Sequence, residues 1–438
     1  MSAFASLSYH DGFGSFVSSE ALPGSLPIGQ NSPQVCPRNL YAEQLSGTAF
    51  TAPRHKNMRS WLYRIKPSVT HSRFEPYSIN GKVCVREHNL VVDPNQLRWD
   101  PRPLPNENID FIDGIELVCG AGDSSLKDGV NIYNYVASSN MSSTNRVLSN
   151  ADGDYLIVPQ HGTLNIRTEM GLIRVEPCEI VVIPRGIKFA VDIEELGGCI
   201  RGYIVETCKG HFELPSLGPI GANGLANPRD FLAPSAAFQD ITGSFTWINK
   251  FACSLFAATL AHSPFDVVGW HGNYYPFKYD LRRFNCMNSV TFDHPDPSIY
   301  TVLTCPSDEP GTAVVDFVIF PPRWIVMDHT FRPPYFHRNC MSEYMGMIYG
   351  KYDAKEGGFV PGGASLHSCM TPHGPDTPTF IKASEAELTP TYFDGGLAFM
   401  FETSYVLKLA PAALSSPQLQ RTYNECWQQL PKLFSSSP

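Results

Sequence analysis

The chain has 438 residues, long enough for a large hydrophobic core and for two domains. Its net charge is −9 with a pI near 5.8, and no run of five or more basic residues occurs, which argues against nucleic acid and anionic membranes as partners. Charged residues make up only 17%, while glycines and prolines number 34 and 37, which favours a turn-rich β protein over a helical one.

Twelve cysteines are scattered along the chain and form no CxxC pair. In a chain of this length, that pattern indicates free, mostly buried thiols in a reducing compartment rather than a disulfide framework. The first residues, MSAFASLSYHDGFG, have neither the basic start nor the apolar centre of a secretion signal, and no apolar run long enough to span a membrane follows. We therefore expect a soluble cytoplasmic protein.

The N-terminal part contains many turn formers and few periodic segments. Residues 23–47 include four prolines, so they form neither a long helix nor a central strand, and we expect an ordered coil that wraps across other surfaces. Residues 59–65 alternate well enough between apolar and polar side chains to predict a strand.

From about residue 111 the pattern becomes steadily β. Short apolar segments closed by glycine or proline recur every eight to ten residues, as is typical of β-sandwiches and jelly rolls. The expected strands lie within 115–119, 130–136, 152–162, 163–168, 172–175, 177–186 and 188–193. The order strand, turn, strand and then Pro-x-Glu-x-x-x-x-Pro-x-Gly, over residues 163–186, resembles half of a cupin.

A second β series begins near residue 267 and runs to about residue 324. Only residues 411–434 have a helical pattern of apolar residues, and these are Leu419, Tyr423, Trp427 and Leu430. We therefore predict a mainly β fold of jelly-roll or cupin-like β-sandwiches with long ordered loops and a C-terminal helix. The expected domains are 1–282, β-rich with extended wrapping segments, and 283–438, cupin-like and carrying the functional site.

Residues 331–376 gather the residue types that bind metals. His337 and Glu343 are six positions apart, a separation that places them on different faces of a helix and about 20 Å apart on one straight strand. A reversal at residues 339–341 sets His337 opposite Glu343 instead, with Cβ atoms about 5 Å apart. The spacing therefore predicts a hairpin in which these two side chains clasp a cation.

A third ligand is expected farther along, from His367 or His373. Two imidazoles and one carboxylate on one face, with open positions, suit a non-haem Fe(II) that activates dioxygen. Zinc accepts the same ligands for hydrolysis or isomerisation. A histidine near a glutamate is also a common hydrogen-bonded structural pair. The residue types alone leave these alternatives open.

Several longer motifs carry a resemblance to a known family. They are LYAEQLSG at 40–47, SWLYRI at 60–65, GPIGANGLANPRDF at 218–231, WHGNY at 270–274, FDHPDPSI at 292–299, DFVIFPPRW at 316–324, FRPPYFHRNCMSE at 331–343 and SLHSCMTPHGPD at 365–376. Together they resemble the homogentisate 1,2-dioxygenase family, and the likeness runs from about residue 12 to about residue 432.

The resemblance implies an Fe(II)- and O2-dependent enzyme of phenylalanine and tyrosine catabolism that cleaves the aromatic ring of homogentisate to give 4-maleylacetoacetate. It assigns the iron ligands to His337, Glu343 and His373, the acid/base to His294, and a substrate-binding position to Tyr352. It also implies a homohexamer, a dimer of trimers, with a cupin-like sandwich in the smaller C-terminal domain.

The chemistry of these residues fits such a reaction. A neutral histidine takes a proton from a hydroquinone hydroxyl near pH 7, and two neighbouring prolines fix the backbone around His294. We expect His367 to hydrogen-bond O2 or substrate, or to orient His373, which also lies at the substrate. Asn339 is a candidate hydrogen-bond donor to the substrate and also a plausible turn residue.

Four apolar residues near the predicted ligands are candidates for a water-excluding lining, although for at least two of them we expect core packing instead. They are Phe336, Met345, Met347 and Phe359.

Overall fold

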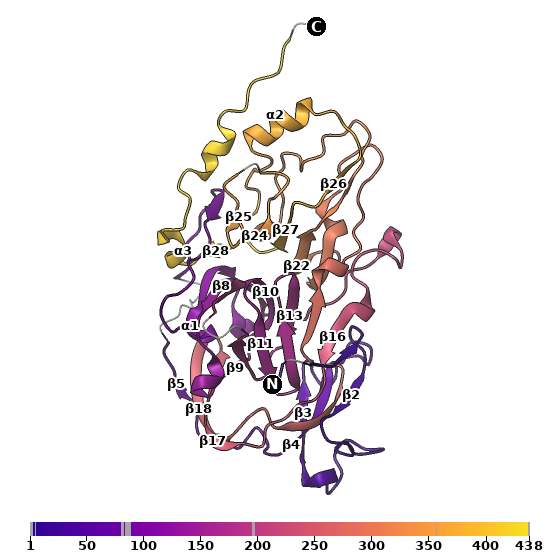
Figure 1. The fold of residues 1–438 in the computed structure, drawn as a ribbon, viewed down its shortest axis with the longest axis vertical. Coiled ribbons are helices and arrows are strands. Elements are labelled where there is room, and N and C mark those ends of the chain that lie inside the picture. Colours follow the sequence, from indigo (N-terminus) through magenta and orange to yellow (C-terminus); the bar gives the residue numbers. More distant parts are fainter. Residues whose placement is uncertain are drawn as a thin grey trace.

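The computed structural model describes residues 3–4, 6–79, 83, 89–194, 198–355 and 357–436. In these residues the strands form five sheets and the helices are short, which confirms the mainly β prediction. Figure 1 shows an elongated molecule with the N-terminal strands in its lower part and α2 in its upper part. No helix in the described ranges is long and apolar enough to cross a membrane.

The largest sheet has nine strands in the order β1-β16-β20-β13-β10-β15-β8-β7-β28. Its central strands are almost wholly buried, which explains why they appear in the sequence as continuous apolar runs closed by glycine or proline. The strands are β1 (Tyr9–Asp11), β7 (Ile115–Ala121), β8 (Val130–Ala137), β10 (Asp154–His161), β13 (Glu179–Ile183), β15 (Ile200–Thr207), β16 (Phe231–Pro234), β20 (Phe277–Asp280) and β28 (Lys408–Leu409).

A second sheet of seven strands has the order β12-β11-β14-β9-β17-β18-β5. Every pairing of named strands in the described residues is antiparallel except that of β9 with β17. Its strands are β5 (Glu75–Pro76), β9 (Arg146–Asn150), β11 (Leu164–Thr168), β12 (Gly171–Val175), β14 (Phe189–Ile193), β17 (Thr242–Phe251) and β18 (Ser254–His262). The strands expected between residues 111 and 193 therefore divide between these two sheets.

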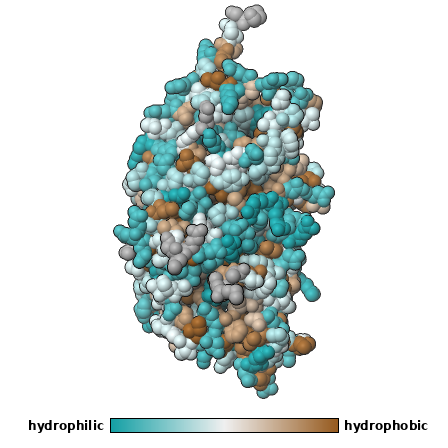
Figure 2. Space-filling model, viewed as in Figure 1, coloured by the Kyte–Doolittle hydropathy of each residue, from teal (hydrophilic) through white to brown (hydrophobic). Residues whose placement is uncertain are grey.

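Strands from near the N-terminus form a small sheet in the order β2-β19-β4-β3, and its edge strand β3 lies within residues 23–47, where coil was expected. Its strands are β2 (Val17–Glu20), β3 (Tyr41–Ser46), β4 (Arg59–Arg64) and β19 (Val267–Gly272). Large side chains in this region remain exposed, including Ile28 and Phe50 at 97% and 82%. On the face drawn in Figure 2, hydrophobic residues are interspersed with hydrophilic ones, and a brown area lies in the lower, N-terminal part.

The C-terminal sheet has six strands in the order β21-β22-β27-β24-β25-β6, and a two-stranded ribbon accompanies it. The sheet strands are β6 (Leu97–Trp99), β21 (Thr301–Pro306), β22 (Ala313–Phe320), β24 (Ser342–Gly350), β25 (Ala364–His367) and β27 (Gly396–Thr403), and the ribbon pairs β23 (Arg323–Ile325) with β26 (Thr391–Phe393). One buried hydrophobic cluster contains residues from this sheet and from the two large N-terminal sheets.

The two halves of the sequence exchange edge strands. β6 comes from the N-terminal half but pairs with β25, whereas β28 comes from the C-terminal end and pairs with β7. Tyr203 of β15 also bridges the halves, because its hydroxyl donates to the carbonyl oxygens of Gly363 and Met347 at 2.8 and 3.3 Å. Its ring contacts Phe399 of β27 edge to face at 4.9 Å. These contacts hold the C-terminal sheet, and with it the site, against the N-terminal core.

Replacing Tyr203 with phenylalanine is expected to lower the free energy of unfolding by about 1–2 kcal/mol. The buried hydroxyl bonds to Gly363 and Met347 are lost, but both carbonyls keep a backbone donor, so the packing survives. Chemical denaturation of the two proteins measures the difference. Tyr392→Phe is the matched control, since that side chain is 49% exposed, and a change as large as that of Tyr203→Phe would contradict the interpretation.

The helices differ from the sequence prediction. A helix does begin at Pro411, but α3 (Pro411–Ser415) ends after five residues, and the rest of the predicted helix is coil with a 3-10 turn, η9 (Tyr423–Trp427). Pro417 explains the break, because it follows the last helical turn and disfavours helical backbone in the residue before it. α1 (Phe111–Gly114) and α2 (Thr377–Glu385) were not expected from the sequence.

Candidate metal centre and cavity

Three of the predicted site residues meet at one point. His337 lies in the loop before β24, Glu343 is the second residue of β24, and His373 lies in the loop between β25 and α2. Nε2 of His373 is 3.1 Å from one carboxylate oxygen of Glu343, and Nε2 of His337 is 3.5 Å from the other. One ligand atom from each residue lies within 4.8 Å of the other two, so a single cation can reach all three.

The backbone, however, is not the predicted hairpin. His337 pairs with His373, and each backbone N–H donates to the carbonyl of the other residue at 2.9 and 3.1 Å. Glu343 pairs with His367 on β25 and with Glu402 on β27. The prediction that His337 lies opposite Glu343 in one hairpin is therefore wrong, because the loop that carries His337 turns away to pair with a segment thirty-odd residues later.

Each histidine ligand is held in one orientation by its own backbone neighbourhood. Nδ1 of His337 donates to the carbonyl of Tyr335 at 2.8 Å, and Nδ1 of His373 donates to the carbonyl of Thr371 at 2.9 Å. Because a carbonyl oxygen only accepts, the proton of each neutral ring sits on Nδ1. Both Nε2 lone pairs are then free for a cation, as a metal-binding histidine requires.

The charges of the three side chains also fit a cation. Burial raises the pKa of Glu343, but hydrogen bonds from His337 and His373 outweigh it and hold the pKa of this carboxylate well below its usual range. Burial lowers the pKa of His337, yet the hydrogen bond to Glu343 raises it overall. Without a metal, positive charge is thus drawn to the point where these atoms converge, which is the place a divalent cation would take.

Two further polar residues flank the carboxylate. The amide nitrogen of Asn339 donates to Glu343 at 3.3 Å and to Glu402 at 2.6 Å, so Asn339 joins the two acids. Burial, together with the nearby Glu343, raises the pKa of Glu402 to about 7. Sequence reasoning missed Glu402, although a single acid within the apolar run of β27 was a usable signal.

His367 lies directly behind the ligands. Its ring stacks on that of His373 with centroids 4.0 Å apart and 11° between planes, and its Nε2 is 2.9 Å from the hydroxyl of Tyr423. Burial lowers the pKa of His367 well below its ordinary value, so the ring is neutral, and its Nδ1 has no hydrogen-bond partner among the residues that the structure describes. This placement suits the expected role of orienting His373.

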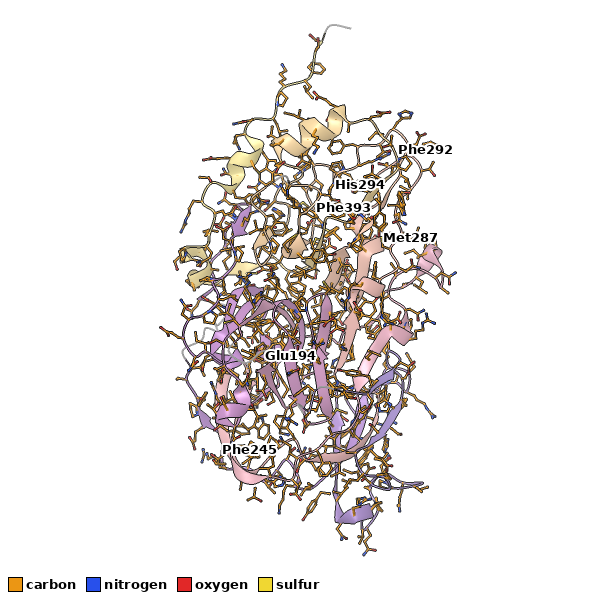
Figure 3. The ribbon with its side chains drawn as sticks, viewed as in Figure 1. Glu194, Phe245, Met287, Phe292, His294 and Phe393 are labelled. Atoms are coloured by element: carbon orange, nitrogen blue, oxygen red, sulfur yellow. The ribbon has the colours of Figure 1, made fainter. Side chains whose placement is uncertain are left out.

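His294 lies in the loop before β21, and the ring of Tyr335 lies between it and the ligand His337. Its Nδ1 donates to the carbonyl of Pro295 at 2.8 Å, and the ring of Tyr335 contacts both His294 and His337 edge to face at 5.7 and 5.6 Å. Burial lowers the pKa of His294, although the bond to Pro295 acts in the opposite direction. Figure 3 shows His294 in the C-terminal half of the molecule, on the same side as Phe393.

One cavity of about 470 Å³ contains the whole site. It is lined by all seven predicted site residues, which are His294, His337, Asn339, Glu343, Tyr352, His367 and His373. Of the four apolar candidates, Met345 and Phe359 line it, whereas Met347 is core and Phe336 packs on Phe380. Lining residues that sequence reasoning missed include Arg98, Tyr335, Lys355, Glu402 and Tyr423.

Tyr352 also lines this cavity. Its ring contacts Phe320 and Phe359 edge to face, with centroids 5.6 and 6.1 Å away. Burial raises the pKa of Tyr352 well above its ordinary value, so the hydroxyl stays protonated and is able to donate a hydrogen bond.

Comparison with known proteins covers nearly the whole chain. Residues 8–281 match the model of the homogentisate 1,2-dioxygenase N-terminal region, and residues 282–434 match that of the C-terminal region. Proteins named homogentisate 1,2-dioxygenase are 54% identical in Arabidopsis thaliana over 98% of this chain and 94% of that protein, 57% in Dictyostelium discoideum over 96% of each, and 55% in Homo sapiens over 98% of each. The chain therefore belongs to the homogentisate 1,2-dioxygenase family.

Proposed function

We propose that this chain holds Fe(II) on His337, Glu343 and His373 and uses it to cleave the ring of homogentisate with O2, giving 4-maleylacetoacetate. The observation that carries the proposal is the convergence of these three side chains in one cavity with His294 and Tyr352, in a chain of this family. The reaction is a step in phenylalanine and tyrosine catabolism.

The donor set supports iron. Two imidazole nitrogens and one carboxylate with open positions form the facial arrangement of non-haem Fe(II) oxygenases. When bound, Fe(II) supplies Lewis acidity toward a phenolate and one-electron chemistry toward O2. Asn339 donates a hydrogen bond to the carboxylate, and the carbonyl partners of His337 and His373 fix the two imidazoles, so the protein presents a preformed ligand face.

The remaining residues act on the substrate. His294 is neutral near pH 7, because its pKa is lowered, and it takes the proton from the hydroquinone hydroxyl that becomes the phenolate. The protonated hydroxyl of Tyr352 donates a hydrogen bond to the substrate. Met345 and Phe359 exclude water from the cavity, which protects the reacting ring and oxidant from side reactions.

Metal reconstitution tests this function. The metal-free protein is loaded anaerobically with Fe(II) in one sample and Zn(II) in another, and oxygen uptake is followed after homogentisate is added. We expect uptake with iron alone, and a ring-cleaved product in equal amount to the oxygen consumed. Uptake with neither metal would overturn the proposed reaction, and a hydrolytic or isomerase activity with Zn(II) would identify a zinc enzyme.

We further propose that the chain works as a cytoplasmic homohexamer, a dimer of trimers, with domains at 1–282 and 283–438. The family resemblance supports the assembly, and the exposed apolar residues near the N-terminus, such as Ile28 and Phe50, supply surface for contacts between copies. Light scattering on the purified protein measures the oligomer, and a monomer at micromolar concentration would contradict it.

A further inference from the structure

The face of the C-terminal sheet that carries Glu343 extends to a residue from the N-terminal half. Arg98 of β6 pairs with Ser365 of β25, two residues before His367, and His367 pairs with Glu343 of β24. Alternate residues of a strand point to the same face, so Arg98, Ser365 and His367 share the face of Glu343. All four line the cavity.

Arg98 is a buried cation without an acidic partner in the described residues. It is 3% exposed, its Nε has no hydrogen-bond partner within the described part of the chain, and the contact from Nη1 to the carbonyl of Gly357 is long, at 3.5 Å. Its guanidinium lies over the ring of Tyr423 at 3.8 Å and over that of Phe359 at 5.5 Å. A buried charge of this kind is costly unless an anion joins it.

The other cations that line the cavity are already accommodated. Arg323 forms an ion pair with Asp353 at 2.5 Å, and Arg338 is exposed to solvent. Nζ of Lys355 donates to the carbonyl of Gly374 at 2.6 Å and lies over Trp427 at 4.3 Å. Among the described cations that line the cavity, only Arg98 combines deep burial with an unused hydrogen-bonding group.

Arg98 lies at a suitable distance from the candidate metal centre for an arylacetate to bridge the two. Arg98 lies two strand spacings from Glu343 across the sheet and two residues from it along the strands. At ordinary strand spacings this offset places the two Cα atoms roughly 12 Å apart, and the side chains on the shared face fill part of that gap. The rings of Tyr423 and His367 connect Arg98 to His373. The ring of Phe359 contacts Tyr352 as well as Arg98.

We propose that Arg98 binds the side-chain carboxylate of the substrate and makes the site specific for acidic hydroquinones. This rests on the proposed function, because it takes homogentisate as the substrate. The planar guanidinium, stacked on Tyr423, presents its nitrogens to a carboxylate in a fixed orientation, which gives a charge-assisted hydrogen bond in a buried setting. An uncharged hydroquinone leaves Arg98 without its anion and is bound less well.

The test compares substrates as well as variants. For iron-loaded wild type, Arg98→Gln and Arg98→Lys, kcat/KM is measured with homogentisate and with its primary amide, which keeps the ring and removes the charge. We expect Arg98→Gln to lower the ratio of the two values by about 10-fold or more, mainly through KM for homogentisate. Arg98→Lys is expected to restore part of the ratio. An unchanged ratio in Arg98→Gln would overturn the inference.

Arg421→Gln is the matched control, because it removes the same charge from an exposed residue of the C-terminal segment. We expect the ratio of kcat/KM for homogentisate to that for its amide to equal the wild-type ratio in this variant. A loss as large as that of Arg98→Gln would show that the effect comes from the net charge of the protein and would overturn the inference.

Calorimetric binding of 3-hydroxyphenylacetate, which lacks the second hydroxyl, supplies a readout without turnover. Wild type is expected to bind it at least 10-fold more tightly than Arg98→Gln does, and equal affinity would count against Arg98 even if Arg98→Gln folds poorly enough to lose activity. If wild type binds this ligand through Arg98 but does not turn over homogentisate with iron, the proposed function fails while the anion site stands.

Discussion

Glu343→Ala is expected to lower the iron content of the purified protein below about one tenth of wild type and to reduce oxygen uptake with homogentisate by about 10³-fold or more. The variant loses the only carboxylate among the three ligands, and the two imidazoles that remain are neutral donors. Metal analysis by mass spectrometry, followed by oxygen-electrode assays with added Fe(II), measures both effects.

Glu402→Gln is the matched control for that loss. Glu402 lies opposite Glu343 on the neighbouring strand and shares the amide of Asn339, but it is not among the three residues whose atoms converge. We expect this variant to keep more than half of the wild-type iron. A Glu343→Ala protein that retains a full complement of iron would show that the carboxylate is not a ligand, and it would remove the support for the facial arrangement.

The residue types of the site could be predicted from the sequence, but not the backbone that unites them. A histidine and a glutamate six positions apart suggested a hairpin, because local spacing was the only geometry available. The structure instead pairs His337 with His373 and Glu343 with His367. Pairing between distant segments depends on the whole sheet, and no sequence pattern within residues 331–376 predicts which segment pairs with His337 or with Glu343.

The central strands of the N-terminal half were predictable for a physical reason. β10 and β13 are buried apolar runs closed by glycine or proline, and such a run has few alternatives to a central strand, whereas the half-exposed strands β2 and β3 were not predicted. The C-terminal helix was predicted from apolar spacing over residues 411–434, whereas Pro417 ends the helix there. Here the backbone restriction of proline outweighed the periodicity of Leu419, Tyr423 and Trp427.

Two of the residues that sequence reasoning missed reach the site from far along the chain. Arg98 arrives on an edge strand from the N-terminal half, and Tyr423 arrives on the C-terminal 3-10 turn. Neither carries a local motif for chemistry, since an arginine between apolar residues and a tyrosine at helical spacing both have ordinary structural roles. Their roles become visible only when the cavity brings them beside His367.

His294→Ala is expected to retain iron near the wild-type level while turnover falls by about 10²-fold or more, the usual contribution of a general base. His294 does not belong to the group of converging ligands, and its ring lies beyond Tyr335 from His337. Loss of iron together with activity would instead make His294 a structural residue. His329→Ala is the matched control, because that imidazole lies in the same half of the chain and its side chain is 93% exposed.

The pH dependence of the reaction separates a base from a packing residue. Because burial lowers the pKa of His294 below its ordinary value, near 6.5, the neutral and active form persists into mildly acidic solution. We expect kcat/KM of wild type to fall only as the pH drops through that lowered pKa, since protonation then removes the acceptor for the hydroxyl proton. In His294→Ala this acid limb should be absent over the range in which the protein keeps its iron, and the remaining rate should rise with pH as hydroxide replaces the missing base. An unchanged acid limb in the variant would assign that titration to another group.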